Sequence, residues 1–123
     1  MALNRDYAVM IEDMLKPLGA VSVRAMFGGG GVYLDGVMFA LIADDVLFFK
    51  ADEQGRKAFE EEGMAPFTYE GKGKAVTMSY WQAPDRLFDD QDEMIEFARR
   101  AIDVARGGKT RKPARKKTSG KAR

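Results

Sequence analysis

Apolar side chains recur every three to four residues at both ends of the folded part of the chain, and this spacing predicts two amphipathic helices. The first helix covers residues 3–18, with Asn4 in the position of an N-cap. The last helix has its apolar stripe over residues 94–105. It follows the acidic pair Asp89-Asp90, which favours a helix start because the helix dipole attracts negative charge there.

Between these helices the apolar residues occur in short runs that are rich in β-branched and aromatic side chains, which is typical of strands. Asp35-Gly36 and Asp44-Asp45 separate three of the runs and predict tight hairpin turns, the first of type I′. A short helix with its first residue as cap is expected over residues 52–62. The expected strands are residues 21–27, 32–34, 37–43, 46–49, 66–69 and 75–81.

Strands that follow one another through hairpins build an antiparallel sheet. The predicted fold class is therefore α+β, with two layers, a mainly antiparallel sheet and the element order α-β4-α-β2-α. The runs at 37–43 and 46–49 hardly alternate between apolar and polar residues, which predicts that both faces of the sheet are covered. Helices would cover one face, and a second subunit or the remaining helices the other.

Four consecutive glycines, Gly28 to Gly31, lie between the first two expected strands. They do not fit a phosphate-binding loop, because a strand and not a helix follows them. We interpret them as a corner or bulge of the sheet, where side chains would clash. The alternative is close approach of a ligand or partner to the backbone, with Arg24 and Tyr33 as its neighbours.

A second aromatic feature is the pair Tyr80-Trp81, close to Pro84. Core packing or an interface is its simpler interpretation, and a stacking platform for bases is the alternative. Together with the glycine region it defines a possible partner or ligand surface, which consists of Arg24, Phe27, Gly28, Gly29, Tyr33, Tyr80 and Trp81.

The chain has no cysteine and no histidine, which excludes disulfides, thiolate metal sites, cysteine nucleophiles and the commonest general base. Ser79 has no histidine with which to form a hydrolase site. The acidic pairs are explained locally by a hairpin turn and a helix cap. We therefore expect no enzyme activity, no catalytic residues, no cofactor and no metal.

Charge is distributed very unevenly. Residues 106–123 contain nine Lys and Arg and no acid, so the other 105 residues hold eleven bases against 19 acids, a net charge of −8. The prediction is a domain over residues 1–105 and a disordered basic tail over residues 106–123. Such a tail can bind nucleic acid without sequence preference, or only solubilise the chain. The expected contacts are Lys109, Arg111, Lys112, Arg115, Lys116, Lys117, Lys121 and Arg123.

No apolar run reaches the roughly 18 residues that a membrane span requires. Acidic residues interrupt the apolar pattern of the first 16 residues, so the start of the chain does not resemble a signal peptide. A cytoplasmic protein without membrane contact is the expectation.

Several segments together resemble the N-terminal domain of the TfoX/Sxy family of competence regulators, over about residues 3–105. They are RAMFGG at 24–29, GVYLDGVMFAL at 31–41, VLFFKAD at 46–52, FTY at 67–69, MSYW at 78–81 and Ala83-Pro84. The resemblance implies a two-layer α+β fold similar to the YjbR-type and secretion-chaperone-like folds, and no known enzymatic activity.

The resemblance also implies a role in regulation. Full-length family members carry a second, helical domain and promote transcription of DNA-uptake genes, apparently with the cyclic-AMP receptor protein. In this chain a basic tail occupies the place of that second domain, so we expect a stand-alone form of the N-terminal domain.

The predicted function is that of a non-enzymatic regulatory or adaptor domain, linked to transcription or competence. Its folded part would bind a protein partner or a second copy of itself, and its tail would add non-specific affinity for nucleic acid. The alternative is a small-ligand-binding domain near Arg24, Phe27, Tyr33 and Trp81, with a tail that only solubilises.

Overall fold

The computed structural model describes residues 3–26, 29–71 and 74–107, and these form an α+β fold with one six-stranded sheet. The helices are α1 (Arg5–Met14), α2 (Arg56–Glu61) and α3 (Gln91–Ala105), with short 3-10 helices η1 (Lys16–Leu18) and η2 (Asp85–Asp89). The strands are β1 (Val21–Met26), β2 (Gly29–Leu34), β3 (Val37–Ala43), β4 (Val46–Lys50), β5 (Pro66–Gly71) and β6 (Lys74–Gln82). Leaving the 3-10 helices aside, this is the predicted order α-β4-α-β2-α.

The ends of the two longer helices follow local side-chain chemistry. The Asn4 side chain accepts a hydrogen bond from the Tyr7 amide at 3.1 Å, and Asp90 accepts one from the Glu93 amide at 3.2 Å. Each bond satisfies an amide that lacks a partner inside the helix. The predicted helix starts at both ends of the domain are confirmed.

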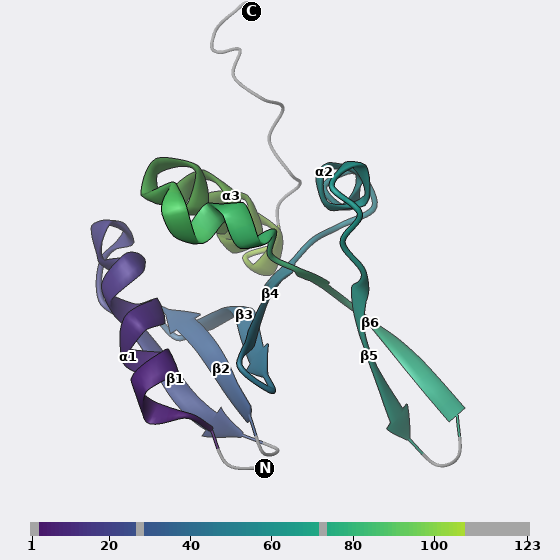
Figure 1. Cartoon of the computed structure of the whole chain (residues 1–123), viewed down its shortest axis with the longest axis horizontal. Coiled ribbons are helices and arrows are strands. Elements are labelled where there is room, and N and C mark those ends of the chain that lie inside the picture. Colours follow the sequence, from purple (N-terminus) through teal and green to yellow (C-terminus); the bar gives the residue numbers. More distant parts are fainter. Residues whose placement is uncertain (1–2, 27–28, 72–73, 108–123) are drawn as a thin grey trace, which may run out of the picture.

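Every strand pair in the sheet is antiparallel, and the strand order is β1-β2-β3-β4-β6-β5. Figure 1 shows the sheet running from β1 beside α1 to the long β5–β6 hairpin, which extends away from the helices. The antiparallel two-layer architecture agrees with the prediction.

The core lies on one face of this sheet. The strand register places Val23, Val32, Ala40, Phe49 and Trp81 in one row across five strands. These side chains join one apolar cluster with Ile11 of α1 and its C-cap Leu15, Phe59 of α2, and the buried stripe of α3 from Met94 to Ile102. All three described helices therefore cover the same face of the sheet.

The glycine segment differs from its prediction. Gly29, Gly30 and Gly31 do not form a corner: they are strand residues of β2, paired with Met26, Ala25 and Arg24 of β1. Phe27 and Gly28 lie outside the described residues. The glycines are needed for space, because a Cβ on Gly29 would overlap the carbonyl oxygen of Ile42.

The middle helix is shorter than predicted. It begins at Arg56, and residues 53–55 form a turn ahead of it. The Asp52 carboxylate accepts the Gly55 amide at 2.7 Å, which is the hydrogen bond expected of the predicted cap. Its end is as expected: Gly63 has φ 75°, and the amides of Gly63 and Met64 bond back to the carbonyls of Glu60 and Phe59. This is the Schellman pattern, which favours glycine at the left-handed position.

Both predicted hairpin turns are present. Asp35 (φ 53°) and Gly36 (φ 80°) adopt the two left-handed conformations of a type I′ turn, and Asp44 (φ 51°) and Asp45 (φ 60°) do the same without a glycine. The tail contacts proposed from residue 109 onward lie outside the described residues. Among the described helices none is long and apolar enough to cross a membrane.

Candidate functional site

The face of the sheet opposite the core carries no described helix, and we call it the open face. One of its rows consists of Arg24, Gly31, Leu41, Phe48 and Gln82, which are register partners from β1 to β6. This row alternates with the core row because successive residues of a strand point to opposite faces. The next row on the open face contains Ser22, Tyr33 and Met38 on β1 to β3, and the register pair Lys50 and Tyr80 on β4 and β6.

Gly31 forms the floor of a side-chain cluster on this face. A Cβ placed on Gly31 would lie 2.9 Å from the sulfur atoms of both Met26 and Met38, and 3.0 Å from a ring carbon of Tyr33. The Tyr33 hydroxyl lies 4.0 Å from the Met26 sulfur. The missing side chain of Gly31 thus lets two methionines and a tyrosine converge over β2.

Two cations lie over tyrosine rings at the open face. The Arg24 guanidinium lies 5.1 Å from the centre of the Tyr33 ring, and the Lys50 ammonium lies 5.0 Å from that of Tyr80. Within the described part of the chain, neither cation forms an ion pair with a carboxylate. Burial, with a smaller contribution from Tyr33, raises the pKa of the Tyr80 hydroxyl above its ordinary value.

Aromatic side chains extend the open face toward the β5–β6 hairpin. Phe48 of β4 contacts Phe67 of β5 edge to face, with ring centres 5.2 Å apart. Since β6 lies between these two strands in the sheet, the two rings meet across β6. Leu41 and Tyr80 are 8% and 6% exposed although no described helix covers them, since their neighbours on the same face shield them.

Acidic residues are almost absent from the sheet. Of the 19 acids only Glu70 lies in a strand, and the others lie in helices, 3-10 helices, turns and connecting segments. The strands contain Arg24, Lys50 and Lys74. The acids of the domain are thus almost confined to helices, turns and connecting segments, whereas cations occur both there and in the strands.

The residues of the predicted partner surface are separated by this architecture. Arg24, Tyr33 and Tyr80 share the open face, whereas Trp81 points into the core, is 9% exposed and stacks on Phe59 with ring centres 6.4 Å apart. Gly29 lies in β2, and Phe27 and Gly28 are outside the described residues. Whether this surface binds a partner stays a prediction.

Sequence reasoning missed Met26, Met38, Phe48 and Lys50 on the open face. The sequence carries no signal for Phe48 and Lys50, because residues 46–49 are all apolar, although their burial in the structure alternates, with Leu47 and Phe49 buried and Val46, Phe48 and Lys50 half-buried. The position of Met38 could not be read from the sequence either, because the pairing of β2 with β3 shifts between Val32 and Tyr33.

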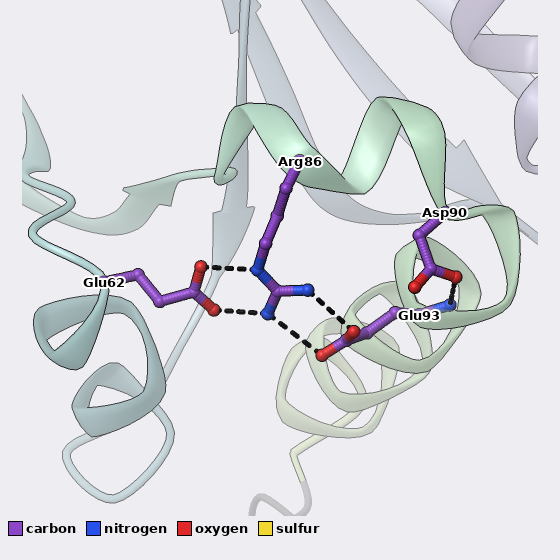
Figure 2. A network of polar contacts seen from close by, with 4 residues as sticks. All are labelled: Glu62, Arg86, Asp90 and Glu93. Atoms are coloured by element: carbon purple, nitrogen blue, oxygen red, sulfur yellow. Dashed lines mark hydrogen bonds and ion pairs between the residues drawn. The ribbon is translucent and has the colours of Figure 1, made fainter.

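A second polar cluster joins the helices on the other side of the molecule (Figure 2). Arg86 of η2 donates to both oxygens of Glu62 and to both oxygens of Glu93, with the shortest contact to Glu93 at 2.7 Å. These hydrogen bonds hold the pKa of the Glu62 and Glu93 carboxyls below the ordinary value for glutamate, and they raise that of Arg86.

This cluster is best explained as a structural clamp. Glu62 is the C-cap of α2 and Glu93 lies in the first turn of α3, so one guanidinium links three consecutive helical elements. Its two bidentate contacts engage four of the five N–H donors of arginine, which leaves little capacity for a ligand. In the described part of the chain no group of three or more acidic side chains is placed to hold a metal ion.

Comparison with known proteins shows which family and which relatives the chain is similar to. The family model described as TfoX N-terminal domain matches residues 13–105. The chain is 26% identical over 94 residues to protein Sxy of Escherichia coli, and 26% identical over 94 residues to DNA transformation protein TfoX1 of Aliivibrio fischeri. It is 28% identical over 123 residues to a 12.7 kDa protein in the trpE 5′ region of Spirochaeta aurantia.

These relatives differ in length. Each of the first two matches covers 76% of this chain but only 45% of the relative, so the chain spans less than half the length of these two proteins. The third covers 100% of this chain and 95% of the relative. Because the family model matches most of the folded part, including the glycine segment and the sheet, the chain belongs to the TfoX N-terminal domain family.

Proposed function

We propose that this chain is a non-enzymatic regulatory module that works by binding. Its folded domain binds a protein partner, and its basic tail holds nucleic acid without sequence preference. The name of one relative, DNA transformation protein TfoX1, supports a process connected with DNA uptake. This role is proposed for the shorter chain, which corresponds to 45% of that relative.

The segregation of charge carries the proposal. The last 18 residues contain nine cations and no acid, while the rest of the chain has a net charge of −8. The basic tail attracts the phosphates of a nucleic acid, and the acidic helices of the folded domain repel them. A nucleic acid bound in this way is held by the tail, and the domain is kept away from it.

A binding measurement on a DNA duplex tests this proposal. The full chain should bind with an affinity that falls roughly 10³-fold or more between about 50 and 200 mM salt, if six or more tail cations contact phosphates. A chain that ends at Gly107 should lose this binding. A full-length variant with glutamine in place of the Lys and Arg residues from 109 onward controls for the length of the tail.

Two results of this binding measurement would contradict the proposal. If the chain that ends at Gly107 binds the duplex as tightly as the full chain, the nucleic-acid contact lies on the domain. If neither binds at low salt, the tail has another role.

One observation favours the second candidate, a domain that binds a small anionic ligand. The Arg24–Tyr33 and Lys50–Tyr80 pairs place two cations without carboxylate partners on one face of the described sheet. A thermal-shift screen with nucleotides and simple anions tests it. Unchanged melting temperatures at millimolar ligand would count against this candidate, and a shift that disappears on replacing both cations would support it.

A further inference from the structure

We propose that the open face binds an acidic amphipathic segment of a partner protein. Arg24 and Lys50 would pair with its carboxylates, while the cluster over Gly31 and the Phe48–Phe67 pair would take up its apolar side chains. The inference rests on the proposed protein-binding role of the domain and names the surface and the chemistry of the partner.

The apolar part of the surface is suited to a peptide segment. Met26 and Met38 are half-buried, converge over Gly31 and are flanked by Tyr33. Methionine is unbranched and has a polarisable sulfur, so it adapts to differently shaped apolar partners and is common at surfaces that bind peptides. The Phe48–Phe67 contact continues this apolar surface toward the β5–β6 hairpin, and this lengthens the surface available to the apolar side of a helix.

The charged part of the surface selects an acidic partner. Arg24 is exposed and Lys50 half-exposed, and each is held only over a tyrosine ring within the described structure. A carboxylate is a stronger partner for either cation than an aromatic face, so both can turn to it without breaking an ion pair. No acid of the described rows lies on this face to compete.

The spacing of the cations fits one helix. Arg24 is on β1 and Lys50 on β4, three strand intervals of about 4.8 Å apart, and Lys50 lies two residues, or about 7 Å, further along its strand than the row of Arg24. The two positions are therefore roughly 16 Å apart. Two acids that are two to three turns apart on a helix are separated by roughly 11–16 Å. A single amphipathic helix can therefore reach both cations while its apolar side lies on the methionines.

Other occupants fit this surface less well. The tail of this chain is cationic and would be repelled by Arg24 and Lys50. The open face of a second copy brings the same two cations. A single-stranded nucleic acid could use the charges, but both tyrosine rings already carry a cation and the methionines offer no flat stacking surface.

A charge-reversal experiment on the full chain tests the proposal. The probe is a fluorescent peptide of about 18 residues, long enough to form a helix, with Leu at helical spacing and Glu elsewhere. A second peptide has Lys in place of Glu. The protein variants are Arg24→Glu/Lys50→Glu, the milder Arg24→Gln/Lys50→Gln, and the control Arg5→Glu/Arg99→Glu, which changes the net charge equally at exposed positions of the two outer helices.

We expect the Glu peptide to bind the wild type, and Arg24→Glu/Lys50→Glu to weaken this binding about tenfold or more. The same variant should gain affinity for the Lys peptide, and the control should stay within about twofold of the wild type. The glutamine variant, with circular dichroism of all variants, separates loss of binding from loss of folding.

Three results would overturn the proposal. One is an equal loss of affinity for the Glu peptide in the control variant Arg5→Glu/Arg99→Glu, which would mean that net charge alone attracts the peptide. Another is a loss of oligothymidylate binding, but not of peptide binding, in Arg24→Gln/Lys50→Gln, which would mark a nucleic-acid surface. The last is self-association of the wild type that this variant abolishes. Duplex binding by the tail is measured separately, so failure here leaves that part of the proposed function intact.

Discussion

The residue type required at some positions of this domain is set by contacts with residues that are distant in the sequence. Gly29, Gly30 and Gly31 look like a turn in the sequence, yet all three are strand residues. Their small size is required by Ile42 on the next strand and by side chains above β2. Such a requirement cannot be read from neighbouring residues.

Replacement of Gly29 by Ala should therefore lower the free energy of unfolding by about 1–3 kcal/mol, because the added Cβ meets the backbone of Ile42. Urea denaturation measures this. Gly31→Ala is the matched comparison: its nearest atoms are the flexible ends of two methionines, which can move aside, so the loss should be smaller. Equal losses in both variants would contradict this account of the glycines.

Substitutions in the turn at Asp44-Asp45 should raise the stability of the domain. Both aspartates have left-handed conformations that glycine and asparagine adopt at lower cost. The variant Asp44→Asn/Asp45→Gly should gain about 0.5–1 kcal/mol of stability in thermal or urea unfolding. Asp35→Asn, in a turn that already has Gly36, should change little. A loss of stability in the first variant would mean that Asp45 contributes more than its exposed, 3.5 Å contact with Asn4 indicates.

Local chemistry explains why the caps and turns could be predicted. Asn4, Asp90 and Asp35-Gly36 act through atoms within three residues of themselves. The predicted surface was only partly assembled: Arg24, Tyr33 and Tyr80 share a face, but Trp81 does not, because its register partner Phe49 faces the core. Which side chains share a face depends on strand order and on the shift in β3.

At the scale of elements, hydrophobic spacing was sufficient for the two longer helices, most strands and the antiparallel sheet. It was not sufficient for the joints between elements. The clamp of Arg86 on Glu62 and Glu93 joins residues 24 and seven positions apart, and no periodicity announces it. It ties the end of α2 to the start of α3, next to the core.

Removal of the clamp should lower the melting temperature, and Arg86→Lys should lie between the wild type and Arg86→Ala, because lysine cannot bridge two carboxylates in bidentate fashion. The effect should depend on pH. Since Arg86 lowers the pKa of Glu62 and Glu93 in the folded state, the clamp stabilises above the unfolded pKa of about 4.3 and is lost as the pH falls below it.

Thermal unfolding between pH 7 and about pH 3 checks this sign. Arg86→Ala should lose less stability than the wild type as the pH falls, so that the two curves approach each other in acid. Parallel curves would show that the two carboxylates do not gain their stability from Arg86.

At the scale of the whole molecule, the distribution of charge is the main functional feature. Residues 1–105 have a net charge of −8, with all but one of their acids outside the strands, and the basic tail carries nine cations and no acid. The possible homodimer stays a prediction, and light scattering at high protein concentration tests it: a monomer there would exclude a second copy as the cover of the open face. A partner with carboxylates fits that face better than a second copy does.

The central claim is that the tail contacts nucleic acid while the folded domain does not. Amide NMR of the full ¹⁵N-labelled chain during titration with a DNA duplex tests it most directly. We predict that shift changes are confined to residues 106–123 and reverse on addition of salt. Changes of equal size on the helices, or at Arg24, Tyr33 and Lys50, would contradict this account.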